Sequence, residues 1–314
     1  MIPHAARAGW SSSGAVSAWA RGLPGQDPAA SGAWLSEQAA RVGDPAFAEL
    51  FRGAAEALGL PVAMFAHRVV AAGDLRLLSG IRFLKRDTER PFVELLAWDG
   101  AEAPSPEGWR AVRAALAEAW AAFEPRAVRL LHPTGLPLPE DAALDMGVHA
   151  APYRAMATPP APRDVRVLPL TDPEAAQAIV AARYDELRRA HPALARDVEP
   201  AGEAEIREAV SAGRALGVAV EGETVGLLAW EPGSVEWIAG DVVIEEVVLA
   251  RASGRGLAAV LQSALARRRA AEAPDTPLIG TIHHANHASR RTALRAGRPE
   301  IGRYSFLPLR GRRP

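Results

Sequence analysis

Hydrophobic and polar positions in the first half of the chain follow two periods, one typical of strands and one typical of helices. Apolar runs rich in branched residues predict strands, and apolar positions spaced three or four apart predict helices. The predicted strands are Val62–Ala71, Leu75–Leu84, Phe92–Trp98, Val128–Leu131 and Val148–Ala157. The predicted helices are one or two within Trp34–Leu58, broken near Gly43-Asp44-Pro45, one over Glu107–Phe123, and a short one before Gly147.

The second half shows the same two periods in a longer series of elements. The predicted strands are Val165–Leu170, Ala215–Val220, Thr224–Trp230, Val242–Leu249, Leu278–His283 and Gly302–Leu309. The predicted helices begin at Thr171-Asp172-Pro173-Glu174, at Glu203, at Leu257 and at Ser289. This mixture of strands and helices predicts a mixed α/β fold.

A proline-rich segment, Thr158 to Arg163, gives the clearest linker signal, because consecutive prolines hold the chain extended. We therefore predict a first domain over residues 1–158, a linker at 159–163 and a second domain over residues 164–314. Residues 1–32 are rich in Gly, Ser, Ala and Pro, which predicts a loose arm or a weak helix. The order of elements in residues 92–157 echoes that of the last third, which indicates a divergent internal duplication.

Composition excludes several classes of function. The chain has 314 residues, 49% hydrophobic and 23% charged, with a net charge of -1, so no basic field favours nucleic acid or an anionic membrane. There is no cysteine, which excludes disulfides and thiolate chemistry and fits a cytoplasmic protein. We expect no signal peptide and no membrane span, since no apolar run reaches about 18 residues.

The segment from Val242 to Ala271 carries the main functional signal. An apolar run leads into Ser253-Gly254-Arg255-Gly256-Leu257-Ala258, and a helical pattern follows. Glycine lets the backbone approach a ligand closely, and a helix start offers unpaired N–H groups at the positive end of its dipole. The pattern therefore predicts a binding site for a phosphate-bearing cofactor.

With these residues the chain resembles the GNAT acetyltransferase superfamily, whose acetyl-CoA motif is Arg/Gln-x-x-Gly-x-Gly/Ala. The motif fits in full from Arg251 to Gly256, or from Ser253 to Ala258 with Ser at its first position. We prefer the second register, because the apolar residues of the helix then match the family. Asn286 and Gly297 stand eleven residues apart, which is the spacing of the family's second signature.

The resemblance implies a tandem GNAT protein with two GNAT-like domains, each a mixed, mostly antiparallel sheet flanked by helices. The second of these domains covers residues 164–314. The corresponding loop of the first domain, Asp99 to Gly108, contains three acids and two prolines, so we expect no acetyl-CoA binding there. The implied reaction transfers an acetyl group from acetyl-CoA, as co-substrate, to a small-molecule amine. A non-catalytic acyl-CoA-binding protein and a scaffold remain alternatives, and a homodimer remains open.

The resemblance also assigns roles to individual residues. The cofactor-binding candidates are Val248, Leu249, Ser253, Gly254, Arg255, Gly256, Leu257, Ala258, Asn286 and Arg290. For each arginine, solvated surface charge is an equal alternative. Strand alternation places Glu245 and Glu246 on opposite faces, and Glu245 is the expected base. Either carboxylate could equally be structural.

The family's usual tyrosine acid is missing, because Ala293 stands at its position, and Arg298 replaces the Phe that often follows Gly297. His283, at the end of a predicted strand, is a candidate for this acid. His283 and His287 have metal-ligand spacing, but no further metal-binding pattern accompanies them, so we expect no metal site.

Overall fold

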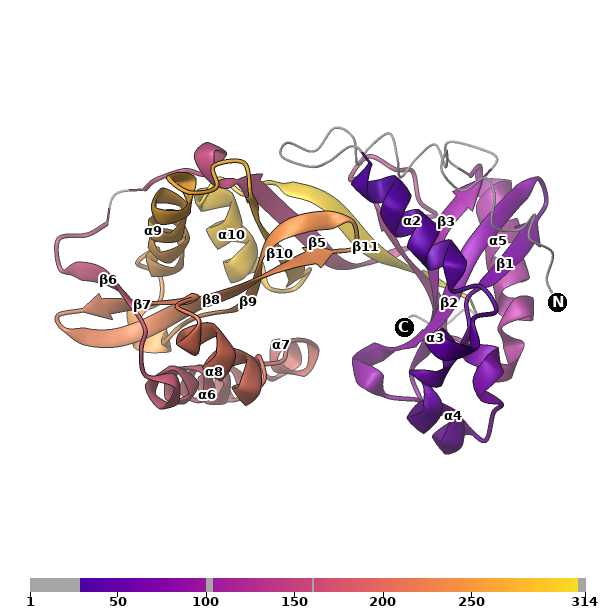
Figure 1. Ribbon diagram of the computed structural model, residues 1–314, viewed down its shortest axis with the longest axis horizontal. Coiled ribbons are helices and arrows are strands. Elements are labelled where there is room, and N and C mark those ends of the chain that lie inside the picture. The colour runs from indigo at the N-terminus through magenta and orange to yellow at the C-terminus, as the bar shows by residue number, and fades with distance from the viewer. Residues whose placement is uncertain (1–28, 100–103, 160, 310–314) are drawn as a thin grey trace. The chain divides into compact units, whose positions relative to one another are not determined.

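The computed structural model describes residues 29–99, 104–159 and 161–309, and these form two compact units (Figure 1). One unit comprises the residues up to Asp145 together with those from Gly302 onward, and the other comprises Met146–Ile301. The expected linker at 159–163 thus falls inside the second unit. Most of the loose arm expected at residues 1–32 lies outside the described residues.

The first unit is a sheet covered by helices, three of which precede its first strand in the sequence. Its strands lie in the order β1-β2-β3-β4-β11. The strands are β1 (Arg68–Ala72), β2 (Leu75–Phe83), β3 (Pro91–Asp99), β4 (Ala127–His132) and β11 (Glu300–Pro308). The helices are α2 (Ala30–Ala40), α3 (Pro45–Glu49), α4 (Arg52–Leu58) and α5 (Pro106–Ala119). Only β3 and β4 run parallel among these described strands.

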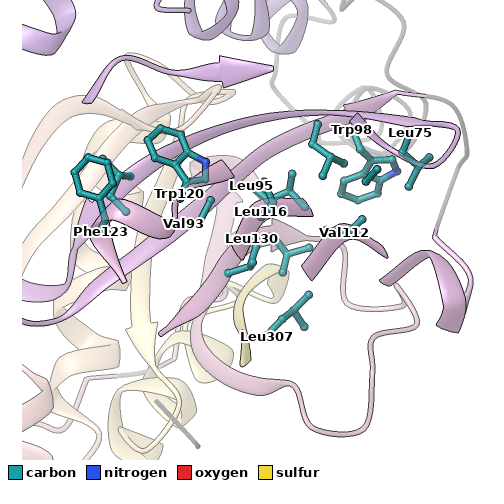
Figure 2. Close-up of a cluster of buried hydrophobic side chains, with 14 of the residues drawn as sticks. Leu75, Val93, Leu95, Trp98, Val112, Leu116, Trp120, Phe123, Leu130 and Leu307 are labelled. Atoms are coloured by element: carbon teal, nitrogen blue, oxygen red, sulfur yellow. The ribbon is translucent and has the colours of Figure 1, made fainter. Parts of the chain in front are cut away.

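The core of the first unit lies between this sheet and α5 (Figure 2). Trp109, Val112 and Leu116 recur every three or four residues along α5, so one face of the helix is buried. Leu307 of β11 is fully buried in the same cluster. The last strand of the chain is therefore part of the core formed by its first half.

The second unit has helices on both faces of its sheet. Its strands lie in the order β5-β10-β9-β8-β7-β6. The strands are β5 (Ala143–Pro152), β6 (Val165–Pro169), β7 (Ala215–Val220), β8 (Glu223–Val235), β9 (Ile238–Val248) and β10 (Pro277–His283). The helices are α6 (Pro173–Ala190), α7 (Pro192–Asp197), α8 (Glu203–Ser211), α9 (Leu257–Ala270) and α10 (His287–Arg295). Figure 1 shows α9 and α10 on one face and α6 and α8 on the other.

The predicted fold class is confirmed: each unit is a mixed α/β structure with one parallel pair of strands, β3 with β4 and β9 with β10. The two units repeat one order of strands, except that their last strands are exchanged. The strand that follows β4 in sequence, β5, pairs with β10, while the strand that follows β10, β11, pairs with β4.

Two details of the expected duplication were wrong. No helix precedes Gly147, because β5 already begins at Ala143 and pairs with β10 up to Met146. The expected strand at Val148–Ala157 is therefore shifted toward the N-terminus and ends at Pro152. The start of the expected strand Val62–Ala71, which lies outside the duplicated segment, was also wrong. Val62–Phe65 forms a turn of 3-10 helix, and β1 begins only at Arg68. Short apolar runs do not by themselves distinguish strands from buried turns.

Side-chain caps explain where the expected helices begin. Asp44 accepts a hydrogen bond from the Ala46 N–H at 2.9 Å, and Pro45 takes the first position of α3. Asp172 does the same for α6 with the N–H groups of Glu174 and Ala175.

In the described part of the chain, no helix has the length and hydrophobicity that crossing a membrane requires.

We predict that Gly297→Ala destabilises the fold more than Gly213→Ala. Both glycines have positive φ, +80° and +68°, so each substitution should cost about 1 kcal/mol in backbone strain. A Cβ on Gly297 would also lie 2.5 Å from the Ala157 nitrogen, whereas one on Gly213 meets no atom within 4 Å. Overpacking should add about 1–2 kcal/mol for Gly297→Ala in urea denaturation. Equal losses for the two variants would contradict this account.

Candidate functional site

The segment that joins β9 to α9 exposes a row of backbone N–H groups. Gly254 and Gly256 have φ of +82° and +76°, and Gly256 precedes α9 without any side-chain cap. Within the described residues, the N–H groups of Gly254 through Ala258 donate no hydrogen bond. The sequence therefore produces an uncapped helix start, which is a favourable place for an anion.

A cation that sequence analysis did not identify lies beside this loop. A Cβ built on Gly256 would lie 2.7 Å from Nη1 of Arg295, at the end of α10. Arg295 is exposed, and it has no ion-pair partner among residues the structure describes. Its only signal in the sequence is its place two residues before Gly297, since the family motif does not include it.

The two arginines named from the sequence are engaged elsewhere. Arg255 pairs with Asp164, with Nη2 and Oδ2 2.6 Å apart. Arg290 pairs with Glu300, with Nη2 and Oε2 3.3 Å apart. The Asn286 side chain caps α10 by accepting a hydrogen bond from the Ser289 N–H at 3.2 Å. These contacts give each of the three residues a structural role.

The other cofactor-binding candidates lie in or next to the same loop. Leu249 and Leu257 are buried, and the Leu249 N–H donates to the Val225 carbonyl oxygen at 2.8 Å. The Ser253 hydroxyl donates to the Leu249 carbonyl oxygen at 3.3 Å. Ser253 therefore stabilises the turn that leads into Gly254.

Strand β9 parts from β10 before it reaches this loop. The two strands pair only at Asp241 with Leu278 and at Val242 with Ile279, although β9 continues to Val248. We call this divergence the splay. In an antiparallel pair, hydrogen-bonded and non-hydrogen-bonded positions alternate. Because the Leu249 N–H bonds to β8, the Val248 N–H points away from β8, toward the splay.

Glu245 lies on the α6 and α8 face of β9 and is only 6% exposed. Its Oε2 accepts a hydrogen bond from the Ala201 N–H and its Oε1 one from the Glu246 N–H, both at 3.0 Å. Burial raises the pKa of this carboxyl, although the two N–H donors oppose the shift. The nearby Tyr184 on α6 has its own pKa raised by burial and by the Glu245 charge.

Glu246 lies on the opposite face, against α9. Both of its carboxylate oxygens accept hydrogen bonds from Gln262 Nε2, at 2.8 and 2.9 Å. Gln262 Oε1 in turn accepts a hydrogen bond from Nε of the buried Arg298 at 2.9 Å. Burial raises the pKa of Glu246 to about 7, against the opposing effects of the Arg298 charge and the Gln262 hydrogen bond. The sequence pattern did not predict this hydrogen-bond network from Glu246 through Gln262 to Arg298.

His283 is the last residue of β10, and its Nδ1 accepts a hydrogen bond from the Ala285 N–H at 3.4 Å. His287 begins α10, so the two histidines do not share a helix. Within the described residues, no group of three or more His, Asp or Glu side chains is arranged to hold a metal ion. Ala293, at the position of the expected tyrosine, is fully buried in α10.

The equivalent helix of the first unit begins differently. The Ser105 hydroxyl caps α5 by accepting a hydrogen bond from the Gly108 N–H at 3.1 Å, and Glu107 occupies the first turn. A carboxylate at this position repels an anion, and its pKa is lowered by backbone hydrogen bonding and by Arg110. Residues 100–103 of the loop that we expected to lack cofactor binding lie outside the described residues.

Two concavities of the second unit lie away from the uncapped helix start. One, of about 190 Å³, borders Arg214, Trp230 and Asp241. The other, of about 320 Å³, borders Val167, Leu216 and Val260. Both lie along the C-terminal part of α9, where Arg268 lines each of them, and neither includes a candidate site residue.

The solved structures that are similar to this chain include GNAT proteins. A GCN5-related N-acetyltransferase from Kribbella flavida is 18% identical over 83% of this chain and 94% of that chain, with a TM-score of 0.41. One from Sphaerobacter thermophilus is 14% identical over 86% and 95%, with a TM-score of 0.47. A tandem GNAT protein from the clavulanic acid biosynthesis pathway is 14% identical over 78% and 80%, with a TM-score of 0.41.

These three neighbours are GNAT proteins. The GNAT superfamily is also the one that the motif spacing of the sequence resembles. No protein-family model and no curated protein matches the chain. Because the likeness to the GNAT neighbours is distant, the activity proposed below rests on the residues of the site.

We predict that Glu246→Gln reduces the loss of stability on raising the pH. A carboxyl whose pKa rises from 4.5 to about 7 on folding favours the folded state when protonated. Wild-type stability should therefore fall between about pH 4.5 and pH 7 by up to about 3 kcal/mol from this group. Urea denaturation near pH 5 and near pH 8 measures this fall, which should be smaller in Glu246→Gln. The same fall in both proteins would contradict the assignment.

Proposed function

We propose that the protein is an acyl-CoA-dependent N-acyltransferase, which transfers an acetyl group from acetyl-CoA to a small-molecule amine. One observation carries this proposal: five consecutive residues, Gly254 to Ala258, present unpaired N–H groups beside the Arg295 guanidinium. This arrangement suits the pyrophosphate of a CoA thioester, which requires several donors and positive charge at close range.

The splay supplies the second part of the proposal. With the pyrophosphate at Gly254–Ala258, the pantetheine arm would extend along the free edge of β9, on the side toward which the Val248 N–H points. That N–H is then available to the thioester carbonyl oxygen, on which negative charge develops during attack by the amine. The backbone thus supplies both the phosphate site and the carbonyl site.

Glu245 supplies the base. It lies on the α6 and α8 face of β9, where the acceptor amine would approach. An amine is protonated near neutral pH and becomes nucleophilic only after it loses a proton. A buried carboxylate with a raised pKa is suited to take that proton, because its pKa lies closer to neutral pH than the pKa of an exposed glutamate.

A non-catalytic acyl-CoA-binding protein is the second candidate. It is favoured by Ala293, which replaces the tyrosine expected to protonate the leaving thiolate. Release of free thiol from acetyl-CoA in the presence of a panel of amines distinguishes the two functions. A protein that binds acetyl-CoA but releases thiol with none of the amines would support the second candidate.

We predict that Arg295→Gln weakens acetyl-CoA binding by about tenfold, as expected for the loss of a charge-assisted hydrogen bond to phosphate. Arg268→Gln is the matched control, because Arg268 is also exposed on a helix but lies near the other end of α9. Calorimetry at fixed ionic strength measures both affinities. Similar affinities for the two variants would remove Arg295 from the site, and failure of the wild type to bind acetyl-CoA would refute the proposed function.

We predict that Glu245→Gln lowers the rate of thiol release by about 10²-fold or more, while the affinity for acetyl-CoA changes little. The amide matches the carboxylate in size but does not accept the proton of the amine. Thiol release and calorimetry with the same protein preparation provide the two measurements. A change confined to affinity would show that Glu245 supports binding and does not act as the base.

A further inference from the structure

The proposed reaction leaves a thiolate on CoA, and the expected tyrosine acid is replaced by Ala293. Glu246 lies two residues before Val248 on the same strand, so alternation places the two side chains on the same face. That face carries α9, whose N-terminus forms the proposed phosphate site. The Glu246 carboxyl therefore lies on the cofactor side of β9, while Glu245 lies on the acceptor side.

Hydrogen bonding determines the direction in which Glu246 can present a proton. Arg298 has only donors, so its Nε fixes the Gln262 carbonyl oxygen as the acceptor. The Gln262 Nε2 must then face Glu246, and it donates to both carboxylate oxygens. Because this nitrogen is a donor only, a proton on Glu246 must point away from Gln262.

We infer that Glu246 is the acid that protonates the departing CoA thiolate, and that Gln262 and Arg298 are positioning residues that orient it. This inference rests on the proposed function. The two carboxyl groups of β9 then act on opposite faces of one strand, one as base and one as acid. The two carboxyl groups have different neighbours, and different neighbours allow chemically identical side chains to act as an acid and as a base.

The proton balance of the step is complete. The Glu245 carboxylate first takes a proton from the ammonium and releases it to solvent. The neutral amine nitrogen then forms a bond to the thioester carbon, and its second proton passes to the Glu245 carboxylate. The carbon–sulfur bond breaks, and sulfur takes the proton of the Glu246 carboxyl. The products are an amide, the free CoA thiol, a protonated Glu245 and an ionised Glu246, and exchange of one proton with solvent at each residue restores the starting state.

The charges that face Glu246 act in opposite directions. The Arg298 guanidinium stabilises the ionised form, whereas Glu245 and burial favour the protonated form. With a pKa near 7, a substantial fraction of Glu246 carries a proton at neutral pH. An exposed glutamate would hold almost none under the same conditions.

A binding experiment tests this inference without knowledge of the acceptor. The affinities of the full-length protein for CoA and for desulfo-CoA, which lacks the sulfur atom, are measured by calorimetry from about pH 6 to about pH 8. The phosphates of the two ligands titrate alike, so their effect cancels in the ratio of affinities. When Glu246 ionises, it can accept a hydrogen bond from the thiol of CoA, which desulfo-CoA lacks. The affinity for CoA divided by the affinity for desulfo-CoA should therefore rise about threefold or more as the pH is raised. This rise corresponds to a shift of about half a unit in the pKa of Glu246.

Variants separate Glu246 from the alternative acid. The ratio should be independent of pH in Glu246→Gln, which is close in shape to the wild type, and should keep its rise in His283→Asn. In Arg298→Met the midpoint of the rise should move to higher pH, because the positive charge that lowers the pKa of Glu246 is gone. Circular dichroism verifies that each variant is folded.

The outcomes separate this inference from the proposed function. A ratio that is flat in the wild type, or a rise that persists in Glu246→Gln and disappears in His283→Asn, would overturn the assignment of the acid while leaving CoA binding intact. If neither ligand binds at any pH, the proposed function fails and the inference fails with it. A midpoint that does not move in Arg298→Met would remove Arg298 as a positioning residue.

Discussion

The candidate site depends on backbone N–H groups that the fold leaves without partners. Sheets and helices normally satisfy these groups internally, and an unpaired donor costs free energy wherever water is excluded. Here two features leave donors free: β9 parts from β10 after Val242, and α9 begins without a side-chain cap. A ligand with acceptor atoms at matching positions would replace the missing partners, so these two features together would provide both affinity and orientation.

The two-residue period of β9 organises the chemistry around this irregularity. Adjacent side chains on a strand point to opposite faces, so the Glu245–Glu246 pair reaches both sides of the sheet from one place. On one side Glu245 is held by N–H groups of the backbone, and on the other Glu246 is held by Gln262 and Arg298. Arg298 stands where the resemblance leads one to expect a phenylalanine, and its charge favours the ionised form of the half-buried Glu246.

Among the described residues, the glycine turn that precedes α9 has no counterpart before α5, although the two units repeat one order of strands. Both units share a parallel strand pair and a helix that follows its first strand, but the two helix starts differ chemically. Ser105 and Glu107 occupy the start of α5 with a hydroxyl cap and a negative charge, whereas α9 starts after two glycines. In the exchange of β5 and β11, each half of the sequence supplies a strand that pairs with a strand of the other half.

The sequence by itself determined most element types, most helix starts and the glycine turn before α9, because these depend on local periodicity, caps and glycine. It also determined that Glu245 and Glu246 face apart, since that follows from strand geometry alone. Only the tertiary structure decided the strand exchange, the splay, the place of Arg295 beside Gly256 and the chain from Glu246 to Arg298. Each of these joins residues that are distant in sequence, and local patterns carry no information about which distant partners meet.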